Sequence, residues 1–185
     1  MGSSGHRAVR SEPVASPRHG NGSCKGYRFR IVTVSTSKYA GKLRGDEIDD
    51  DSGNVAERMV RKSHGGISTH TLISDDRKML TKEAEGFLEG TDDVAVFVGG
   101  TGVSHDDVTI ETIRPFFEKE LDGFGEMLRE KSFHSIGGAA FLTRATAGVV
   151  RGKLIVCLPG SPDAVKTGLR EALGVFPSVI KESRV

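Results

Sequence analysis

The sequence predicts an α/β fold, a three-layer αβα sandwich in which helices cover both faces of a mostly parallel, mixed sheet. Short apolar runs alternate with segments of helical periodicity along most of the chain, as they do in such folds. The clearest run is VAVFV at residues 94–98, which two aspartates precede and two glycines follow. An uninterrupted apolar run of this length is typical of a parallel strand buried on both faces.

The chain divides into a tail and one domain. Residues 1–26 are rich in Ser, Gly, Pro, Arg and His and have almost no periodic apolar positions. We expect them to form a basic, polar, disordered tail. Residues 27–185 carry the periodic segments and have the length of a single folded domain.

The composition favours a small-molecule partner. The 26 Lys and Arg residues nearly balance the 25 Asp and Glu residues, a net charge of +1. No overall field therefore attracts nucleic acid or an anionic membrane, and we expect neither as a partner. The chain has two cysteines and no apolar stretch near the ~20 residues that span a bilayer. These features predict a cytoplasmic protein with reduced thiols.

The first half of the chain predicts two strands, each followed by a helix. Residues 27–35 alternate in polarity and then become β-branched, which indicates a strand. Residues 67–73 form a second strand ahead of a helical pattern at 79–88. Between the strands, residues 38–50 are expected to form a charged loop and residues 52–63 a helix.

The charged loop carries four carboxylates close to a predicted sheet edge. They are Asp46, Glu47, Asp49 and Asp50. Loops at the carboxyl ends of parallel strands are where α/β sheets bind ligands. The alternative, which we favour, is that these side chains stabilise the N-terminus of the next helix, which Asp51 or Ser52 can cap.

The second half predicts further elements on either side of the central strand. Pro115 interrupts a short helix, two glycines at 137 and 138 end a longer one, and Ser161 can cap the last strong helix. In order, the elements are a helix at 109–117, a helix at 123–133, two strands or a loop and a strand at 139–150 and 153–158, a helix at 163–173 and a less regular helical segment from residue 177.

A glycine-rich turn follows the central strand. Gly99, Gly100 and Gly102 lack Cβ atoms, so a ligand can approach main-chain N–H groups directly, and an anion suits such a turn. Asp107 brings a carboxylate to the mouth of the turn, which suggests a divalent cation between it and a phosphate. The alternative is a tight strand-to-helix connection with a capping residue.

A second acidic position reaches the same edge of the predicted sheet. Asp75 or Asp76 follows the second strand, although either could instead cap the next helix. The chain contains no GxGxxG dinucleotide motif, no GxSxG nucleophile motif and no HExxH metal motif. The functions that stay open are phosphate chemistry with magnesium and ligand binding without catalysis.

Seven sequence blocks resemble the MoaB/MogA family of molybdenum cofactor biosynthesis proteins, whose fold also occurs as a domain of gephyrin. The blocks are VSTSKY (34–39), DDSGN (50–54), LISDD (72–76), FVGGTGVSHDDVT (97–109), GFGEMLREKSF (123–133), FLTRATAG (141–148) and LPGSPDAV (158–165). A series of blocks in a family's order is far more specific than a lone glycine turn. The STSKY opening and the IGG at 136–138 are closer to the MoaB branch.

The resemblance implies the molybdopterin-binding-domain fold and a molybdopterin adenylyltransferase. In that reaction the terminal phosphate of molybdopterin attacks the α-phosphorus of ATP, and the products are adenylyl-molybdopterin and pyrophosphate. The resemblance also implies Mg²⁺ as cofactor, a homotrimer or a hexamer made of two trimers, and a MoeA-type molybdate-insertion protein as partner. The sequence does not choose between a molybdenum and a tungsten pathway.

The family's functional residues carry over to particular positions. Asp75 and Asp107 match the two essential aspartates and would hold the magnesium ion. Asp51 and Gly53 fit the family's DxSG-like turn, for which a structural capping role is at least as strong an alternative. The expected substrate and nucleotide contacts are Gly99, Gly100, Thr101, Gly102, Ser104, Thr143, Arg144, Pro159, Gly160 and Ser161.

A second function class stays open. His105 and Asp106 occupy positions where many relatives carry arginine, so a positive charge near the triphosphate is missing. This departure favours a non-catalytic oligomer that binds molybdopterin and passes it to a MoeA-type protein. The two retained aspartates, Asp75 and Asp107, favour the enzyme.

Overall fold

The computed structural model describes residues 23–185, so most of the predicted tail, residues 1–22, lies outside the described residues. The described chain forms a six-stranded sheet in the order β2-β1-β3-β6-β5-β4. The strands are β1 (Arg28–Val34), β2 (Gly66–Ile73), β3 (Val94–Val98), β4 (Lys119–Glu120), β5 (Thr146–Val150) and β6 (Lys153–Leu158). Strands β1, β2, β3 and β6 are parallel, and β5 is antiparallel to both of its neighbours. The predicted mostly parallel, mixed sheet is confirmed.

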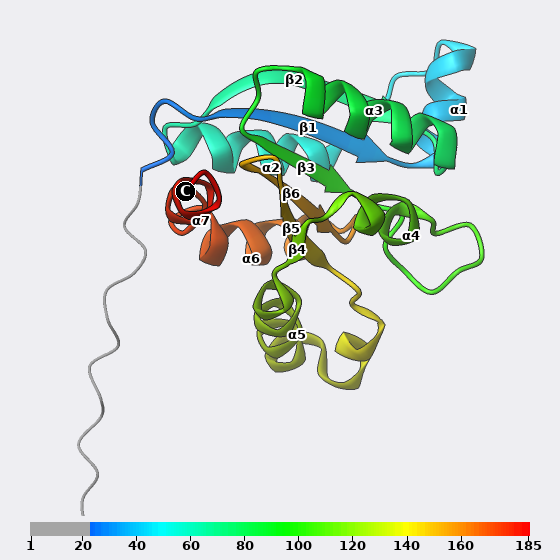
Figure 1. The fold of residues 1–185 in the computed structure, drawn as a ribbon. Helices are drawn as coiled ribbons and strands as arrows, with labels where there is room; N and C mark the ends of the chain where they lie inside the picture. The colour runs from blue at the N-terminus through cyan, green and yellow to red at the C-terminus, as the bar shows by residue number, and fades with distance from the viewer. Residues whose placement is uncertain (1–22) are drawn as a thin grey trace, which may run out of the picture.

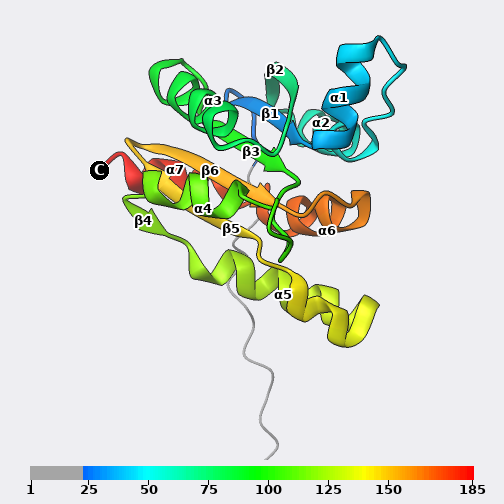
Figure 2. The same cartoon turned by 90° about the vertical axis from the view of Figure 1, so that its right-hand side faces the viewer.

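Helices cover both faces of this sheet (Figure 1 and Figure 2). One face packs against α2 (Asp51–Lys62), α5 (Asp122–Ile136), α6 (Pro162–Ala172) and α7 (Phe176–Ser183), and the other against α3 (Arg77–Glu89) and α4 (Thr109–Ile113). In β3, Val94, Val96 and Val98 belong to the first core, and Ala95 and Phe97 belong to the second. Because both faces of the strand are removed from water, its sequence has no polar position.

The segment after β1 differs from the prediction. Residues 36–44 form a helix, α1 (Thr36–Arg44), where the sequence predicted a loop from residue 38 onward. Ser35 caps this helix by accepting a hydrogen bond from the Lys38 N–H, and Gly45 ends it with a left-handed φ of 86°. Gly41 is the one buried residue of α1, so the helix produces no apolar periodicity in the sequence.

The cap of α2 also differs from the prediction. The helix begins at Asp51, and its N-cap is Asp50 rather than Asp51 or Ser52. Asp50 Oδ1 accepts a hydrogen bond of 3.2 Å from the backbone N–H of Gly53. Asp50 therefore has the capping role that the sequence analysis gave to Asp51 or Ser52.

The segment around Pro115 and the one after α5 also differ from the prediction. The predicted helix at 109–117 divides at the proline into α4 and a 3-10 helix, η1 (Arg114–Phe116). Residues 137–142 form a second 3-10 helix, η2 (Gly137–Leu142), and β5 begins only at Thr146. The first part of the strand or loop predicted at 139–150 is therefore a 3-10 helix and a short connection, and its last part is strand β5.

Both cysteines are free and fully buried. Cys24, which the sequence analysis assigned to the tail, donates its N–H to Ser63 O at 2.8 Å and its thiol to Leu173 O at 3.2 Å. Cys157 lies in β6, where burial raises the pKa of its thiol strongly. The packed core therefore includes the chain from at least Cys24 onward.

Among residues 23–185, no helix combines the length and the apolar character that crossing a membrane requires.

Candidate functional site

A cavity of about 430 Å³ opens at the carboxyl ends of parallel strands. Val34 ends β1, Val98 ends β3, and Pro159 follows β6. The other lining residues are Thr33, Ser35, Lys38, Ser52, Asp75, Gly99, Gly100, Thr101, Gly102, Asp107, Leu142, Thr143 and Gly160. This is the edge at which open α/β sheets bind ligands. Most of the residues proposed from the sequence therefore meet around one cavity.

The turn after β3 requires glycine at two positions. Gly99 and Gly100 have left-handed φ angles of 112° and 61°. A Cβ at Gly99 would collide with the carbonyl oxygen of Val34, and one at Gly100 would collide with Asp75 Oδ1 and Thr109 Oγ1. The absence of Cβ atoms thus lets the turn lie directly against a candidate catalytic carboxylate.

Asp75 is a partly buried carboxylate at the wall of the cavity. Its Oδ2 accepts hydrogen bonds from the backbone N–H of Thr36 at 3.2 Å and from the Thr36 hydroxyl at 3.3 Å. Its Oδ1 is buried and has no hydrogen-bond partner among the described residues. Burial raises the pKa of Asp75, the negative charge of Asp107 raises it further, and the Thr36 hydrogen bonds oppose the shift. A cation at Oδ1 would satisfy this oxygen and relieve the repulsion.

The geometry distinguishes Asp75 from Asp76, which the sequence could not do. Asp76 is the N-cap of α3, and its Oδ1 accepts a hydrogen bond of 2.9 Å from the backbone N–H of Met79. Asp75 lines both the cavity of about 430 Å³ and an adjoining hollow, and Asp76 lines only the adjoining hollow. Asp76 thus has the capping role, and Asp75 is the one of the two carboxylates that lines this candidate cavity.

Asp107 reaches the cavity from the loop that follows the glycine turn. Its Oδ2 accepts a hydrogen bond of 3.0 Å from the backbone N–H of Ser104, and a Cβ at Gly102 would lie 2.7 Å from the same oxygen. The next helix is tied to the turn, because Thr109 N–H donates to Gly100 O at 3.0 Å. Thr109 Oγ1 is buried without a partner among the described residues. A second unsatisfied oxygen therefore lies close to Asp75 Oδ1, beside Gly100.

Three of the residues proposed from the sequence do not line the cavity. Arg144 is paired with Glu111 on α4 and lines a neighbouring hollow that it shares with Thr143. Ser161 is the N-cap of α6, because its hydroxyl accepts a hydrogen bond of 3.3 Å from Ala164 N–H. Ser104 lines an adjoining hollow that Asp75 and Asp107 share. They surround the cavity without lining it.

Sequence reasoning missed the wall of the cavity that β1, α1 and α2 build. Thr36 holds Asp75, and Lys38 lines the cavity with its ammonium group 3.5 Å from Asp50 Oδ1. Lys38 had appeared only as one of several charged residues in a predicted loop. Its place three residues after a strand that ends in serine was the available signal, since Ser35 can cap a helix there.

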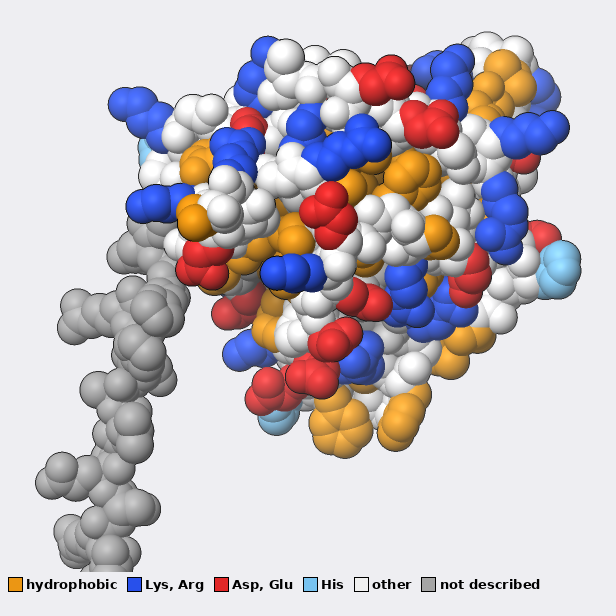
Figure 3. All heavy atoms as spheres, viewed as in Figure 1, with side chains coloured by type: hydrophobic (Ala, Val, Ile, Leu, Met, Phe, Trp, Pro, Cys, Tyr) orange, Lys and Arg blue, Asp and Glu red, His pale blue; other side chains and the backbone are white. Residues whose placement is uncertain are grey.

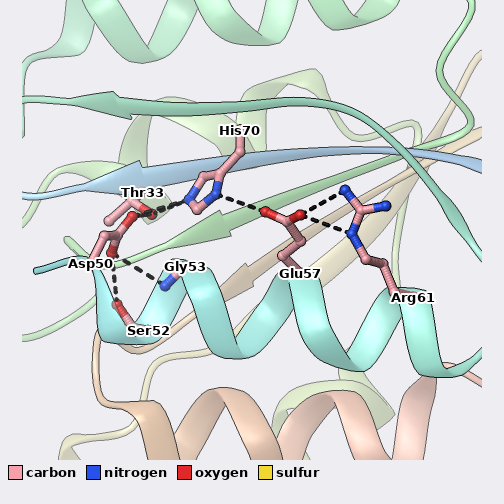
Figure 4. A network of polar contacts seen from close by, with 7 residues as sticks. All are labelled: Thr33, Asp50, Ser52, Gly53, Glu57, Arg61 and His70. Atoms are coloured by element: carbon pink, nitrogen blue, oxygen red, sulfur yellow. Dashed lines mark hydrogen bonds and ion pairs between the residues drawn. The ribbon is translucent and has the colours of Figure 1, made fainter.

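A polar network lies behind this wall (Figure 4). Asp50 Oδ2 accepts a hydrogen bond of 2.6 Å from the Thr33 hydroxyl and lies 3.0 Å from His70 Nε2. His70 Nδ1 lies 3.3 Å from Glu57 Oε2, and Arg61 pairs with the same carboxylate. Burial acts to raise the pKa of Asp50, but hydrogen bonds from His70, Thr33 and Gly53 and the charge of Lys38 outweigh it and hold that pKa far below its usual range.

The network predicts a pH dependence of stability. The Asp50 hydrogen bond raises the pKa of His70 above its ordinary value of 6.5, and burial only partly opposes this. A raised pKa in the folded state gives stability that is complete below pH 6.5 and is lost as the pH rises through the folded-state value. The free energy of unfolding of the wild-type protein should therefore exceed that of His70→Asn by the largest amount at low pH. This difference should decrease above neutral pH.

Denaturant unfolding of both proteins between pH 5.5 and 9 measures that difference. His64→Asn is the matched control, because His64 is exposed and its left-handed φ of 67° suits asparagine. A stability difference that stays constant over this pH range would show that the network does not raise the pKa of His70.

Three comparisons relate this fold and site to known proteins. Residues 30–178 match the family described as a probable molybdopterin binding domain. The chain is 38% identical to the probable molybdopterin adenylyltransferase of Methanocaldococcus jannaschii, over 79% of this chain and 87% of that protein. It is also 38% identical to the molybdopterin adenylyltransferase of Pyrococcus furiosus, over 86% and 93% of the two chains.

Among solved structures, the tungsten cofactor synthesizing protein MoaB from Pyrococcus furiosus superposes with a TM-score of 0.77 at 36% sequence identity. The superposition covers 86% of this chain and 98% of that one. The family match spans the cavity, the glycine turn and both aspartates. The chain therefore belongs to the MoaB/MogA family of molybdopterin-binding domains.

Proposed function

We propose that this protein acts in molybdenum cofactor biosynthesis as a molybdopterin adenylyltransferase. A terminal phosphate oxygen of molybdopterin would attack the α-phosphorus of ATP, form a phosphoanhydride bond and displace pyrophosphate. The two adenylyltransferase relatives support this reaction by their names and their coverage. The observation that carries it is the convergence of Asp75, Asp107 and the Gly99–Gly102 turn on one cavity.

Magnesium fits this arrangement as the cofactor. Residues 23–185 contain no cluster of three or more His, Cys, Asp or Glu side chains that could hold a metal ion by themselves. Magnesium usually takes one or two carboxylates and completes its shell with water and substrate phosphates. Asp75, with its unpartnered buried oxygen, and Asp107 supply those two carboxylates. The ion would neutralise phosphate charge as the α-phosphorus reacts.

The remaining roles follow from position. The turn Gly99–Gly102 would receive phosphate oxygens on its backbone, and Thr143 and Gly160 would contact the substrates from the opposite connections. Arg144 would have to leave Glu111 to reach the pterin. Ser104 and Ser161 do not line the cavity, so they would contact only the parts of the substrates that extend beyond it.

The decisive test is formation of adenylyl-molybdopterin. Purified protein is mixed with ATP and molybdopterin, with magnesium or with a chelator in excess, and the product and pyrophosphate are quantified. We expect equimolar product and pyrophosphate with magnesium and loss of turnover with the chelator. Tight molybdopterin binding without turnover in either condition would remove the enzyme proposal.

That last outcome would support the second candidate, a binding protein that passes molybdopterin to a MoeA-type partner. The observation in its favour is that residues 99–113, which include the glycine turn and its following loop, contain no lysine or arginine. His105 and Asp106 are almost fully exposed and leave this side of the cavity without a permanent cation. A cytoplasmic location stays a prediction for either candidate.

An oligomer, either a trimer or a pair of trimers, is a further part of the proposal. Large apolar side chains are exposed along α5 and η2, and Figure 3 shows hydrophobic atoms gathered at the bottom of that view. They are Phe133, Ile136, Phe141 and Leu142, with Phe141 85% exposed. Such a patch is typical of a protein interface. Sedimentation velocity at several concentrations distinguishes a trimer from a hexamer and from a monomer.

A further inference from the structure

The cavity is lined by more carboxylates than cationic side chains. Asp75 and Asp107 both line it, and Lys38 is the one lysine, arginine or histidine among the described lining residues. ATP and a phosphate ester together carry more negative charge than one divalent ion neutralises. A cation on the protein would offset part of the remaining negative charge if both substrates bind there.

Lys38 pairs with Asp50 and, among the described residues, with neither of the two cavity aspartates. Its Nζ lies 3.5 Å from Asp50 Oδ1, which also accepts the Gly53 N–H at 3.2 Å. A flexible ammonium group without this tether would pair with Asp75 or Asp107 and compete with magnesium. Asp50 thus keeps Lys38 on the β1 side of the cavity.

Asp50, which pairs with Lys38, also contacts His70. The second Asp50 oxygen, Oδ2, is occupied by the Thr33 hydroxyl and by His70 Nε2, as Figure 4 shows. The groups that face His70 are Thr33 from β1, Asp50 at the N-cap of α2, and Glu57 with its partner Arg61 from α2. A charged His70 offsets part of the Asp50 charge and so weakens the attraction between Asp50 and Lys38.

We infer that Lys38 is the phosphate-binding cation of the cavity and that the Asp50–His70 pair is its positioning element. This inference rests on the proposed function, since it assumes that phosphate-bearing substrates enter the cavity. Lys38 moves from Asp50 to a phosphate oxygen when substrate binds, and Asp50 keeps its hydrogen bonds from Thr33, His70 and Gly53.

The first experiment measures binding of ATP with magnesium by calorimetry, without molybdopterin, so that no turnover is needed. Lys38→Met should weaken binding about tenfold, the loss expected for one charge-assisted hydrogen bond. Lys38→Arg should stay within about threefold of wild type, because the charge is kept. Lys42→Met is the matched control on the same helix, since Lys42 is exposed and does not line the cavity.

Unchanged binding in Lys38→Met, or equal losses in Lys38→Met and Lys42→Met, would overturn the inference. Wild-type protein that binds no ATP would overturn both the inference and the proposed function. Binding that depends on Lys38 without any adenylyl-molybdopterin formation would leave the inference standing and remove the proposed enzyme. With an active wild type, Lys38→Met should raise the KM for ATP more than it lowers kcat.

A double-mutant cycle tests the positioning role of His70. His70→Asn leaves the charge of Asp50 uncompensated, so Lys38 is held more tightly, and ATP binding should weaken about threefold. In the Lys38→Met background the same substitution should have no effect, whereas a merely structural role would weaken binding equally in both. Additive effects would remove His70 and Asp50 from the inference.

Discussion

Asp75→Asn should lower the rate of adenylyl-molybdopterin formation at least about 100-fold, because removing one preorganised electrostatic group from a reacting site typically costs this much. The same change should make the substrate-free protein more stable at neutral pH. The pKa of Asp75 is raised, chiefly by burial, so its charged form is disfavoured in the fold at pH values above its usual range. Asparagine keeps an oxygen for the two Thr36 hydrogen bonds and removes the charge.

Kinetics and thermal unfolding on the same protein samples separate these two effects. Asp76→Asn is the matched control, because asparagine caps a helix as well as aspartate does and should leave both properties nearly unchanged. Asp107→Asn should behave like Asp75→Asn in the kinetic assay. If activity survives in Asp75→Asn but disappears in Asp76→Asn, then Asp76 is the catalytic carboxylate and our assignment is wrong.

Gly53→Ala should destabilise the protein by about 2–3 kcal/mol, although alanine normally favours a helix by about 1 kcal/mol over glycine. Gly53 lies in the first turn of α2, where a Cβ would collide with polar atoms of Thr33, Asp50 and His70. The new methyl group would separate these buried and partly buried partners and break their hydrogen bonds.

Gly86→Ala provides the comparison within the same fold. Gly86 lies in α3, and a Cβ there would meet only the end of the flexible Arg30 side chain, at 3.3 Å. That variant should be unchanged or up to about 1 kcal/mol more stable, as helix propensity predicts. Urea denaturation of both variants measures the difference. Equal stabilities would mean that the Asp50 network can move aside at little cost.

The parts of the fold that the sequence predicted are those in which burial leaves a pattern. The strand Val94–Val98 is apolar throughout because both of its faces are covered. Helix α1 was missed because it buries Gly41 alone, and two-residue β4 is too short to have a period.

The candidate site divides in the same way. Asp75 and Asp107 could be proposed because both follow predicted elements at a known edge of the sheet. The direction of a side chain is not encoded in spacing, so the sequence could not show that Arg144 pairs with Glu111 or that Asp76 is a cap. The pairing of His70 with Asp50 joins residues 20 positions apart and depends on the register of β2 beside β1.

The reactivity of the two buried cysteines can report how different parts of the fold open. Cys157 lies on β6 in the middle of the sheet and belongs to the core beneath α3 and α4, so a thiol reagent reaches it only after that core opens. Cys24 is held at the rim by backbone partners at Ser63 and Leu173. Its modification needs only the detachment of the N-terminal segment from the ends of α2 and α6, so the two labelling rates separate local fraying from global unfolding.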